Sequence, residues 1–102
     1  MSVTEIQVTA SGGGEIPCIS AFPSQGVGTG VVVVPSIFGV DADMAMVADR
    51  LAREGYAAVV LDPFWRDEDF GVIGHDEEGR KRAFARLERT PFDQAFGDLT
   101  DV

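Results

Sequence analysis

The sequence holds little of what several classes of protein require. Its one cysteine, Cys18, excludes an internal disulfide, and its one histidine, His75, excludes a histidine-rich metal site. No stretch approaches the roughly 20 apolar residues that span a bilayer. The opening residues, MSVTEIQV, lack the basic and then apolar pattern of a secretory signal, and no D-x-D-x-D-G calcium loop is present. We therefore expect a cytoplasmic protein without a metal, a cofactor or a membrane span.

Basic residues are also scarce. Lys and Arg number 8 against 17 Asp and Glu, which gives a net charge of −9. This balance argues against binding to nucleic acid or to an anionic membrane by long-range attraction. The hydrophobic content of 45% nevertheless indicates a packed core, and 102 residues suffice for one small domain.

The most informative stretch is residues 30–62. Residues 31–34 and 56–61 are apolar at every position, which predicts two strands covered on both faces. Asp41 or Asp43 is expected to cap a helix between them, and Gly55 to end it. The order strand, helix, strand predicts a βαβ unit and hence the α/β fold class. The apolar stripe of that helix is Met44, Val47, Ala48, Leu51 and Ala52.

Alternating residues precede this unit. Residues 4–9 and 15–21, joined by a glycine-rich turn, predict an antiparallel hairpin at the edge of the sheet. Pro17 suits an edge strand better than a central one, because it has no N–H to donate.

Two further helices are predicted after the βαβ unit. Residues 76–87 should form a helix whose acidic start complements the helix dipole. Its inward residues are expected to be Ala83, Phe84 and Leu87, and its mostly outward ones Arg80, Lys81, Arg82 and Arg86. Thr90 is expected to cap the last helix, with Pro91 at its first position. The apolar stripe of that helix is Phe92, Ala95, Phe96, Leu99 and Val102.

That last stripe lacks a strand to cover it, and one sheet edge would stay open. We therefore expect the fold of residues 1–102 to be incomplete. Either the sequence is a part of a longer protein, or another chain completes it.

Loops at the carboxyl ends of the two parallel strands are the expected ligand site. Residues 35–39 and 62–66 should lie there side by side. Ser36 is a poor candidate for a nucleophile, because the G-x-S-x-G elbow and an identifiable base are lacking. Either Phe64 and Trp65 pack under the second loop as a small cluster, or Trp65 or Phe38 forms a wall of an apolar pocket. The glycines of residues 26–30 precede a strand instead of following one, which argues against a nucleotide-binding domain.

The segment GVVVVPSIFGVDADMAMVADRLAREGYAAVVLDPFWR, followed by DEEGRKRAFARL and FDQAFGDLTDV, resembles the N-terminal half of the dienelactone hydrolase (carboxymethylenebutenolidase) family. The resemblance implies the N-terminal part of an α/β-hydrolase-type sheet, and hydrolysis of a lactone or ester by a Cys-Asp-His triad. In family members the triad lies in the second half. We therefore expect residues 1–102 to be inactive by themselves and to need that half.

The resemblance also implies roles for single residues. The backbone N–H of Ile37 would belong to the oxyanion hole, and Arg80 would bind a substrate carboxylate. Ser36, Phe38 and Trp65 would contact the substrate. Ser36 stands where the family has a glutamate, and a hydroxyl carries no negative charge at neutral pH. A related esterase therefore fits as well as a strict dienelactone hydrolase.

A second hypothesis is a non-catalytic half-domain that assembles with another chain. The apolar stripe of the last helix, around Phe92, Phe96 and Leu99, would form its interface. Polar substitutions there should improve the solubility of a fragment but abolish the assembly of such a module.

Overall fold

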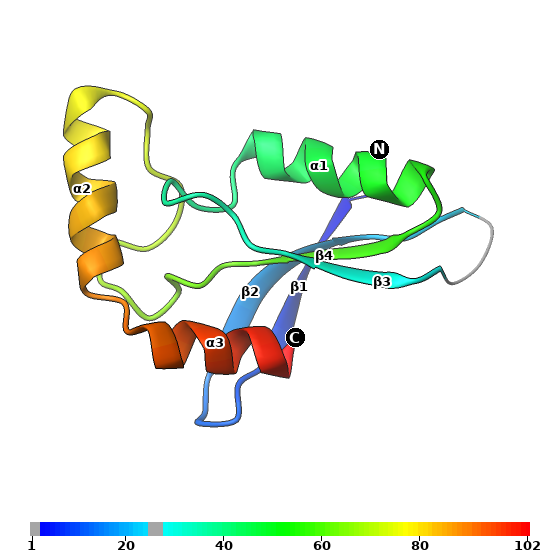
Figure 1. Cartoon of the computed structure of the whole chain (residues 1–102), viewed down its shortest axis with the longest axis horizontal. Coiled ribbons are helices and arrows are strands. Elements are labelled where there is room, and N and C mark those ends of the chain that lie inside the picture. Colours follow the sequence, from blue (N-terminus) through cyan, green and yellow to red (C-terminus); the bar gives the residue numbers. More distant parts are fainter. Residues whose placement is uncertain (1–2, 25–27) are drawn as a thin grey trace.

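The computed structural model is a flat α/β layer structure of 41 × 32 × 17 Å (Figure 1). It describes residues 3–24 and 28–102, apart from the side chain of Phe92, so part of the glycine-rich stretch at residues 26–30 lies outside the described residues. The four strands form one sheet in the order β1-β2-β4-β3. The strands are β1 (Val3–Thr9), β2 (Glu15–Ala21), β3 (Gly30–Val33) and β4 (Ala57–Leu61), and the helices are α1 (Ala42–Arg53), α2 (Glu77–Glu88) and α3 (Phe92–Asp101).

The N-terminal hairpin is confirmed. β1 and β2 pair antiparallel, with Val3 opposite Ala21 and Thr9 opposite Glu15. Pro17, however, lies on an inner strand, because β2 pairs with β4 on its other side. Its carbonyl accepts from Asp62 N at 3.0 Å, so its missing N–H faces the β4 side just beyond the paired residues. The expected edge position is therefore wrong.

The βαβ unit is confirmed as well. β3 and β4 pair parallel, from Gly30 opposite Ala57 to Val33 opposite Val60. Helix α1 buries Ala48 and Ala52 against the central strands. Asp41, and not Asp43, caps α1, because its Oδ1 accepts from Met44 N at 3.2 Å. The left-handed end at Gly55 has φ 96°. The residues of β2 and β4 beneath α1 are Ala21, Ala58 and Val60.

The two parallel strands differ in burial. β4 is covered on both faces, as predicted, with Ala58 and Val60 fully buried. β3 is not: Val32 is 42% exposed, and Val34 just beyond the strand is 56% exposed. β3 pairs with β4 alone, so it forms an edge of the sheet in this chain. The apolar run predicts a strand correctly but not its coverage.

Helix α3 lies on the sheet face opposite α1 (Figure 1). Leu99 and Val102 pack against a cluster formed by the hairpin and β4, whereas Phe96 is 57% exposed. The expected cap at Thr90 is wrong. Its Oγ1 donates to Arg86 O at 2.9 Å, and Pro91 is the N-cap without a side-chain bond. The cluster beneath α3 consists of Ala10, Ile16, Cys18 and Leu61.

Helix α2 stands beside the sheet, beyond the ends of β3 and β4 (Figure 1). Asp76 caps it, with Oδ1 accepting from Gly79 N at 2.6 Å. Ala83 is buried, as predicted, but Phe84 and Leu87 are 52% and 44% exposed. Arg86 was expected to point outward and is instead fully buried. The buried residues of α2 are Gly79, Ala83 and Arg86, and a Cβ on Gly79 would lie 1.9 Å from Gly74 O.

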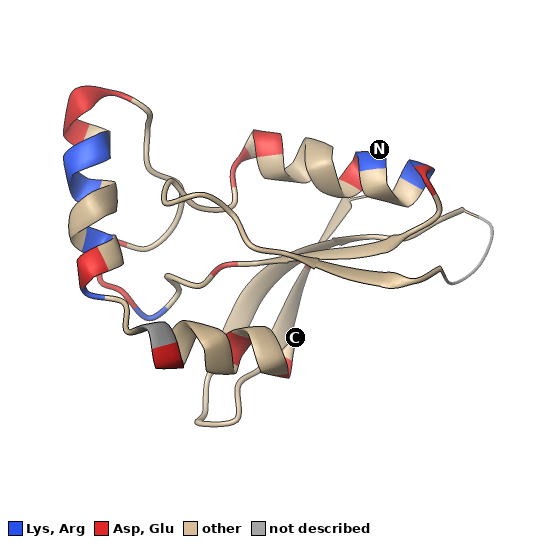
Figure 2. Cartoon of the chain, viewed as in Figure 1, with Lys and Arg blue, Asp and Glu red and all other residues tan. Residues whose placement is uncertain are grey.

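Charged residues gather on the helices and on the long connection between β4 and α2 (Figure 2). Arg82 of α2 and Arg89 at its C-terminal end pair with Asp69 and Asp67 of that connection, whereas the charged residues of α3 are all acidic. No helix in the described part of the chain is long and apolar enough to span a membrane.

Candidate functional site

The loop that follows β3 meets the connection that follows β4 at residues 71–73, beyond the predicted stretch 62–66. Ile73 N donates to Phe38 O at 2.9 Å. Gly39 lies so close to Gly71 that a Cβ on Gly39 would be 2.8 Å from Gly71 O. The first loop, residues 35–41, is therefore packed on the segment that leads from β4 to α2.

Residues 36–39 form a turn in which every carbonyl is bonded. Ser36 O accepts from Gly39 N at 3.1 Å, and Gly39 O accepts from Asp41 N at 3.1 Å. Ile37 O accepts from Arg86 Nη2 at 2.6 Å. Phe38 O receives the bond from Ile73 described above. The peptide groups of this turn are therefore fixed although the turn belongs to no helix or strand.

The N–H groups of the same turn are used differently. Phe38 N donates to Ser36 Oγ at 3.3 Å, which is a local serine turn. Gly39 N closes the turn onto Ser36 O. Within the described residues, no group accepts from the N–H of Ser36 or of Ile37. Because the peptide before Ile37 is trans, its N–H points away from the Ser36 carbonyl that Gly39 holds.

Arg86 joins this turn to the β4–α2 connection. Its Nη1 donates to Asp69 O at 2.9 Å and to Gly71 O at 2.7 Å, and its guanidinium lies 4.3 Å from the centre of the Phe64 ring. Burial lowers the pKa of Arg86, while the negative charge of Asp62 opposes this shift most strongly. The guanidinium is held by carbonyl oxygens and an aromatic face without a carboxylate in direct contact.

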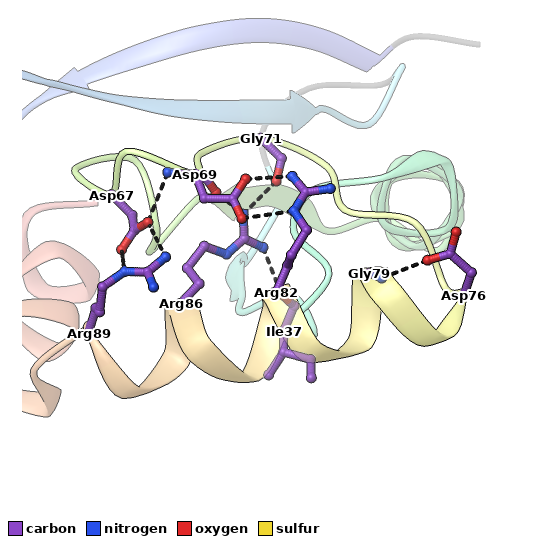
Figure 3. Close-up of polar contacts among 9 residues, drawn as sticks. All are labelled: Ile37, Asp67, Asp69, Gly71, Asp76, Gly79, Arg82, Arg86 and Arg89. Carbon is purple, nitrogen blue, oxygen red and sulfur yellow. Dashed lines mark hydrogen bonds and ion pairs between the residues drawn. The ribbon is translucent and has the colours of Figure 1, made fainter.

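Two other arginines, Arg82 of α2 and its C-cap Arg89, hold the same connection (Figure 3). Arg82 pairs with Asp69, with Nε–Oδ2 at 3.1 Å, and Arg89 pairs with Asp67, with Nε–Oδ2 at 3.0 Å. The side-chain bonds with Arg82 and Arg89 lower the pKa of Asp69 and Asp67, respectively. Helix α2 is thus attached to the site mainly by polar contacts.

Phe38 stacks on His75, with ring centroids 4.0 Å apart. His75 is 60% exposed, and its Nε2 lies 3.5 Å from Asp41 Oδ2. Phe38 is therefore supported from the β4–α2 connection, a contact that the sequence did not indicate.

Trp65 lies on the opposite side of the sheet from α1 and belongs to the cluster beneath α3. Its Nε1 donates to Asp98 Oδ2 at 3.0 Å, and Arg66 binds both oxygens of the same carboxylate, at 2.7 and 3.0 Å. Of the two alternatives for Trp65, packing describes its place in this structure. A contact with substrate stays a prediction.

Arg80 is exposed on α2, and no side-chain contact to it occurs among the described residues. Cys18 lies on β2 beneath α3, where burial and the charge of Asp62 raise its pKa to about 11. In the part of the chain that the structure describes, no three His, Cys, Asp or Glu side chains are placed to hold a metal ion. Ser36, Ile37 and Phe38 are adjacent, but among the described residues no hydrogen bond, ion pair or ring contact joins Trp65 or Arg80 to them.

An open pocket of about 610 Å³ lies over the hairpin, and residues 36–38 do not line it. Within the turn, Ser36 is exposed, Ile37 and Phe38 are half-buried and Gly39 is buried. The pocket is lined by Glu5, Ile6, Gln7, Pro17, Cys18, Ile19, Val40 and Asp62.

Known proteins are similar to this chain in sequence and in fold. The model of the Dienelactone hydrolase family matches residues 16–101. The chain is 35% identical over 87 residues to the "Putative carboxymethylenebutenolidase" of Azospirillum brasilense, covering 83% of this chain and 38% of that protein. It is 30% identical over 95 residues to the carboxymethylenebutenolidase of Pseudomonas sp. (strain P51), which covers 92% of this chain and 40% of that protein.

The crystal structure named "Putative Dienelactone Hydrolase" from Klebsiella pneumoniae superposes with a TM-score of 0.75 at 25% identity. The superposition covers 99% of this chain and 42% of the chain in that crystal structure. The sequence thus spans about two fifths of the relatives that it matches. The extent of the family match and the shared fold lead to one conclusion: the chain belongs to the dienelactone hydrolase family.

Proposed function

We propose that residues 1–102 form the N-terminal part of the domain of an enzyme that hydrolyses carboxylic ester or lactone bonds. Its contribution to the chemistry is the N–H of Ile37 as a donor to the oxyanion. The observation that carries this proposal is the turn at residues 36–39, in which all four carbonyls are bonded while the N–H of Ile37 has no acceptor among the described residues.

When a nucleophile attacks an ester carbonyl, the electron pair of the C=O bond moves onto oxygen. A fixed N–H about 2.7–3.1 Å from that oxygen stabilises the developing charge. Fixing the donor beforehand avoids reorganisation during the reaction, so its benefit appears in kcat. The bonded carbonyls of the turn supply that rigidity.

The nucleophile must come from elsewhere in the polypeptide. Cys18 is buried beneath α3, and its pKa of about 11 keeps it a thiol at neutral pH. Ser36 Oγ accepts from Phe38 N, and no described side chain lies within hydrogen-bond distance of it as a base. The family's triad, carried by the portion of the relatives that this sequence does not match, would supply the nucleophile. The lone, buried thiol of Cys18 also suits the cytoplasm as the compartment.

The decisive substitution is Ile37→Pro in the longest polypeptide that the source gene encodes. Proline removes the N–H, and the second position of a turn accommodates it. Esters and lactones should be hydrolysed roughly 10²–10³ times more slowly. Ile37→Val keeps the N–H and is the matched control, for which kcat should stay within about threefold of wild type. Equal activity of both variants would exclude Ile37 as the donor.

Gene length and intact mass form the first check. A coding sequence that continues past Val102 and carries G-x-C-x-G-G or G-x-S-x-G would support the proposal. A stop codon directly after Val102 would overturn it for this chain.

Arg80 is the candidate for binding an acidic substrate, since its exposed guanidinium is not paired with any described residue. Arg80→Gln should raise KM for esters that carry a free carboxylate and leave KM for neutral esters unchanged. An equal effect on both would show that Arg80 does not contact the carboxylate.

The second candidate is a non-catalytic half-domain that pairs with another chain. The exposed apolar residues on β3 and α2, including Val32 and Phe84, favour it. Phe84→Ser distinguishes the two, because it should raise the solubility of an incomplete domain but abolish assembly of an interaction module.

A further inference from the structure

Among the described residues, Arg86 is the only residue of α2 whose side chain makes a hydrogen bond to the turn at residues 36–39. Its Nη2 donates to Ile37 O at 2.6 Å, while Nη1 reaches the carbonyls of Asp69 and Gly71 (Figure 3). We propose that Arg86 is a positioning residue: it fixes the peptide after Ile37 and thereby the direction of the Ile37 N–H. This inference rests on the function proposed above.

The geometry couples Arg86 to the donor through one peptide group. The peptide between Ile37 and Phe38 is held at both polar ends, by Arg86 at its carbonyl and by Ser36 Oγ at its N–H. The peptide before it is held through Ser36 O by Gly39. Neither peptide can rotate while these bonds persist, so the N–H of Ile37 keeps one direction.

A guanidinium suits this task better than any other side chain. Its planar fork bonds three carbonyls from two loops at once, and its face packs on the Phe64 ring. The Arg86 side chain is fully buried, and its Nε has no partner among the described residues. Burying a cation in this way opposes stability. The gain lies in the fixed distance between the loops.

Arg82 and Arg89 provide matched controls. They bind the same connection through Asp69 and Asp67, but their side chains are 49% and 43% exposed. Neither bonds to the turn at residues 36–39. A role limited to holding the connection would therefore give all three arginines similar effects.

The test uses the polypeptide encoded by the complete gene and the variants Arg86→Met, Arg82→Gln and Arg89→Gln. Arg86→Met should lower kcat for an ester by roughly 10²-fold, with KM within about threefold, because an angstrom of misplacement at a donor has that effect. The other two variants should retain kcat within about twofold.

A thionoester of the same alcohol separates positioning from loss of folded protein. Its sulfur accepts hydrogen bonds poorly, so loss of an oxyanion donor slows it less than the ordinary ester. Arg86→Met should therefore lower the ratio of ester to thionoester kcat by about tenfold or more. A ratio equal to that of wild type would overturn the proposal, whatever the absolute rates.

A second variant covers the event that Arg86→Met does not fold. Arg86→Lys keeps a buried cation but cannot span three carbonyls. The same ratio should fall severalfold at a thermal midpoint near that of wild type. An unchanged ratio would again overturn the role of Arg86.

A wild-type protein that hydrolyses no ester or lactone would refute the proposed function and leave Arg86 to be judged by amide hydrogen exchange. Phe38 N donates to Ser36 Oγ, and Ile73 N donates to Phe38 O, so both amides report on the order of the turn at residues 36–39. Their exchange should be at least tenfold faster in Arg86→Met than in wild type, and unchanged in Arg82→Gln. Equal exchange in both variants would show that Arg86 does not order the turn.

Discussion

Replacing Asp98 with asparagine should weaken the attachment of α3 more than any other isosteric change in that helix. Asp98 is 2% exposed and accepts three hydrogen bonds, one from Trp65 Nε1 and two from the guanidinium of Arg66. Both donors come from the segment after β4. The carboxylate therefore joins α3 to the end of a central strand.

The expected loss follows from these contacts. A hydrogen bond to a charged group contributes about 1.5–3 kcal/mol when its partner is buried. The Arg66 side chain is 30% exposed and regains water when released, so its pair contributes only about 1 kcal/mol. The NH2 group of asparagine would also face the N–H donors of Trp65 and Arg66, which cannot accept a hydrogen bond from it. We expect Asp98→Asn to lower the free energy of unfolding by about 2–3 kcal/mol.

Urea unfolding followed by the fluorescence of Trp65, the one tryptophan in the sequence, measures this change. Asp101→Asn is the matched control, because it removes the same charge from α3. Asp101 accepts from Ser11 N at 2.8 Å in an exposed position, where water replaces a lost bond, so Asp101→Asn should lower the free energy of unfolding clearly less than Asp98→Asn does. For a domain of this size, Asp98→Asn should lower the thermal midpoint by roughly 10–20 °C. Equal shifts for the two variants would refute the reasoning.

Three further predictions concern other parts of the chain. Cys18, with a pKa of about 11, should react with iodoacetamide at pH 8 at least about 10²-fold more slowly in the native than in the unfolded protein, and equal rates would show that it is exposed. The side-chain bond from Arg89 lowers the pKa of Asp67, so the stability it adds is complete above the unfolded pKa of about 3.9 and is lost as pH falls through the folded pKa. Asp67→Asn should accordingly flatten the acid limb of the stability curve, and an unchanged limb would contradict this. Gly39→Ala should destabilise the protein by more than 1 kcal/mol, because φ is 97° there and the Cβ would meet a carbonyl. Gly97→Ala, in open space on α3, should stabilise it by up to about 1 kcal/mol, and thermal melts distinguish the two.

Local patterns predict most of the secondary structure. The hairpin, the βαβ unit and the start of α2 follow from alternation, apolar runs and caps such as Asp76. The burial of each strand by its neighbours did not follow from these patterns. The runs that form β3 and β4 look alike in sequence, but β4 lies between two strands and β3 has one neighbour. Which edge is paired depends on contacts between distant segments, and a local pattern does not encode them.

The arrangement of α2 was less predictable. A polarity pattern places every arginine in solvent, and it therefore placed Arg86 there. One signal was present, since the small residues Gly79 and Ala83 lie at helical spacing with Arg86 on one face. Phe84 and Leu87 were expected inside because they are apolar, yet the face of α2 toward the loops is set by arginine bonds.

The candidate site, like the fold, could be predicted from the sequence only in part. The turn after β3 was located from strand order, and the role of Ile37 followed from resemblance. The bond from Trp65 to Asp98 spans 33 positions, and that from Arg86 to Ile37 spans 49. No periodicity connects residues so far apart, so these contacts require the structure.

The bonds that hold the Ile37 N–H all lie between residues 36 and 86, within this sequence. On the proposed function, the donor side of the site is therefore ordered by contacts that do not involve the nucleophile. If that is correct, the absence of a nucleophile, and not a misplaced donor, accounts for the inactivity expected of residues 1–102. If the gene encodes residues beyond Val102, supplying them as a separate chain should then restore hydrolysis, and the restored kcat should depend on Arg86. Restoration that is equal for wild type and Arg86→Met would place the ordering of the turn in the added chain instead.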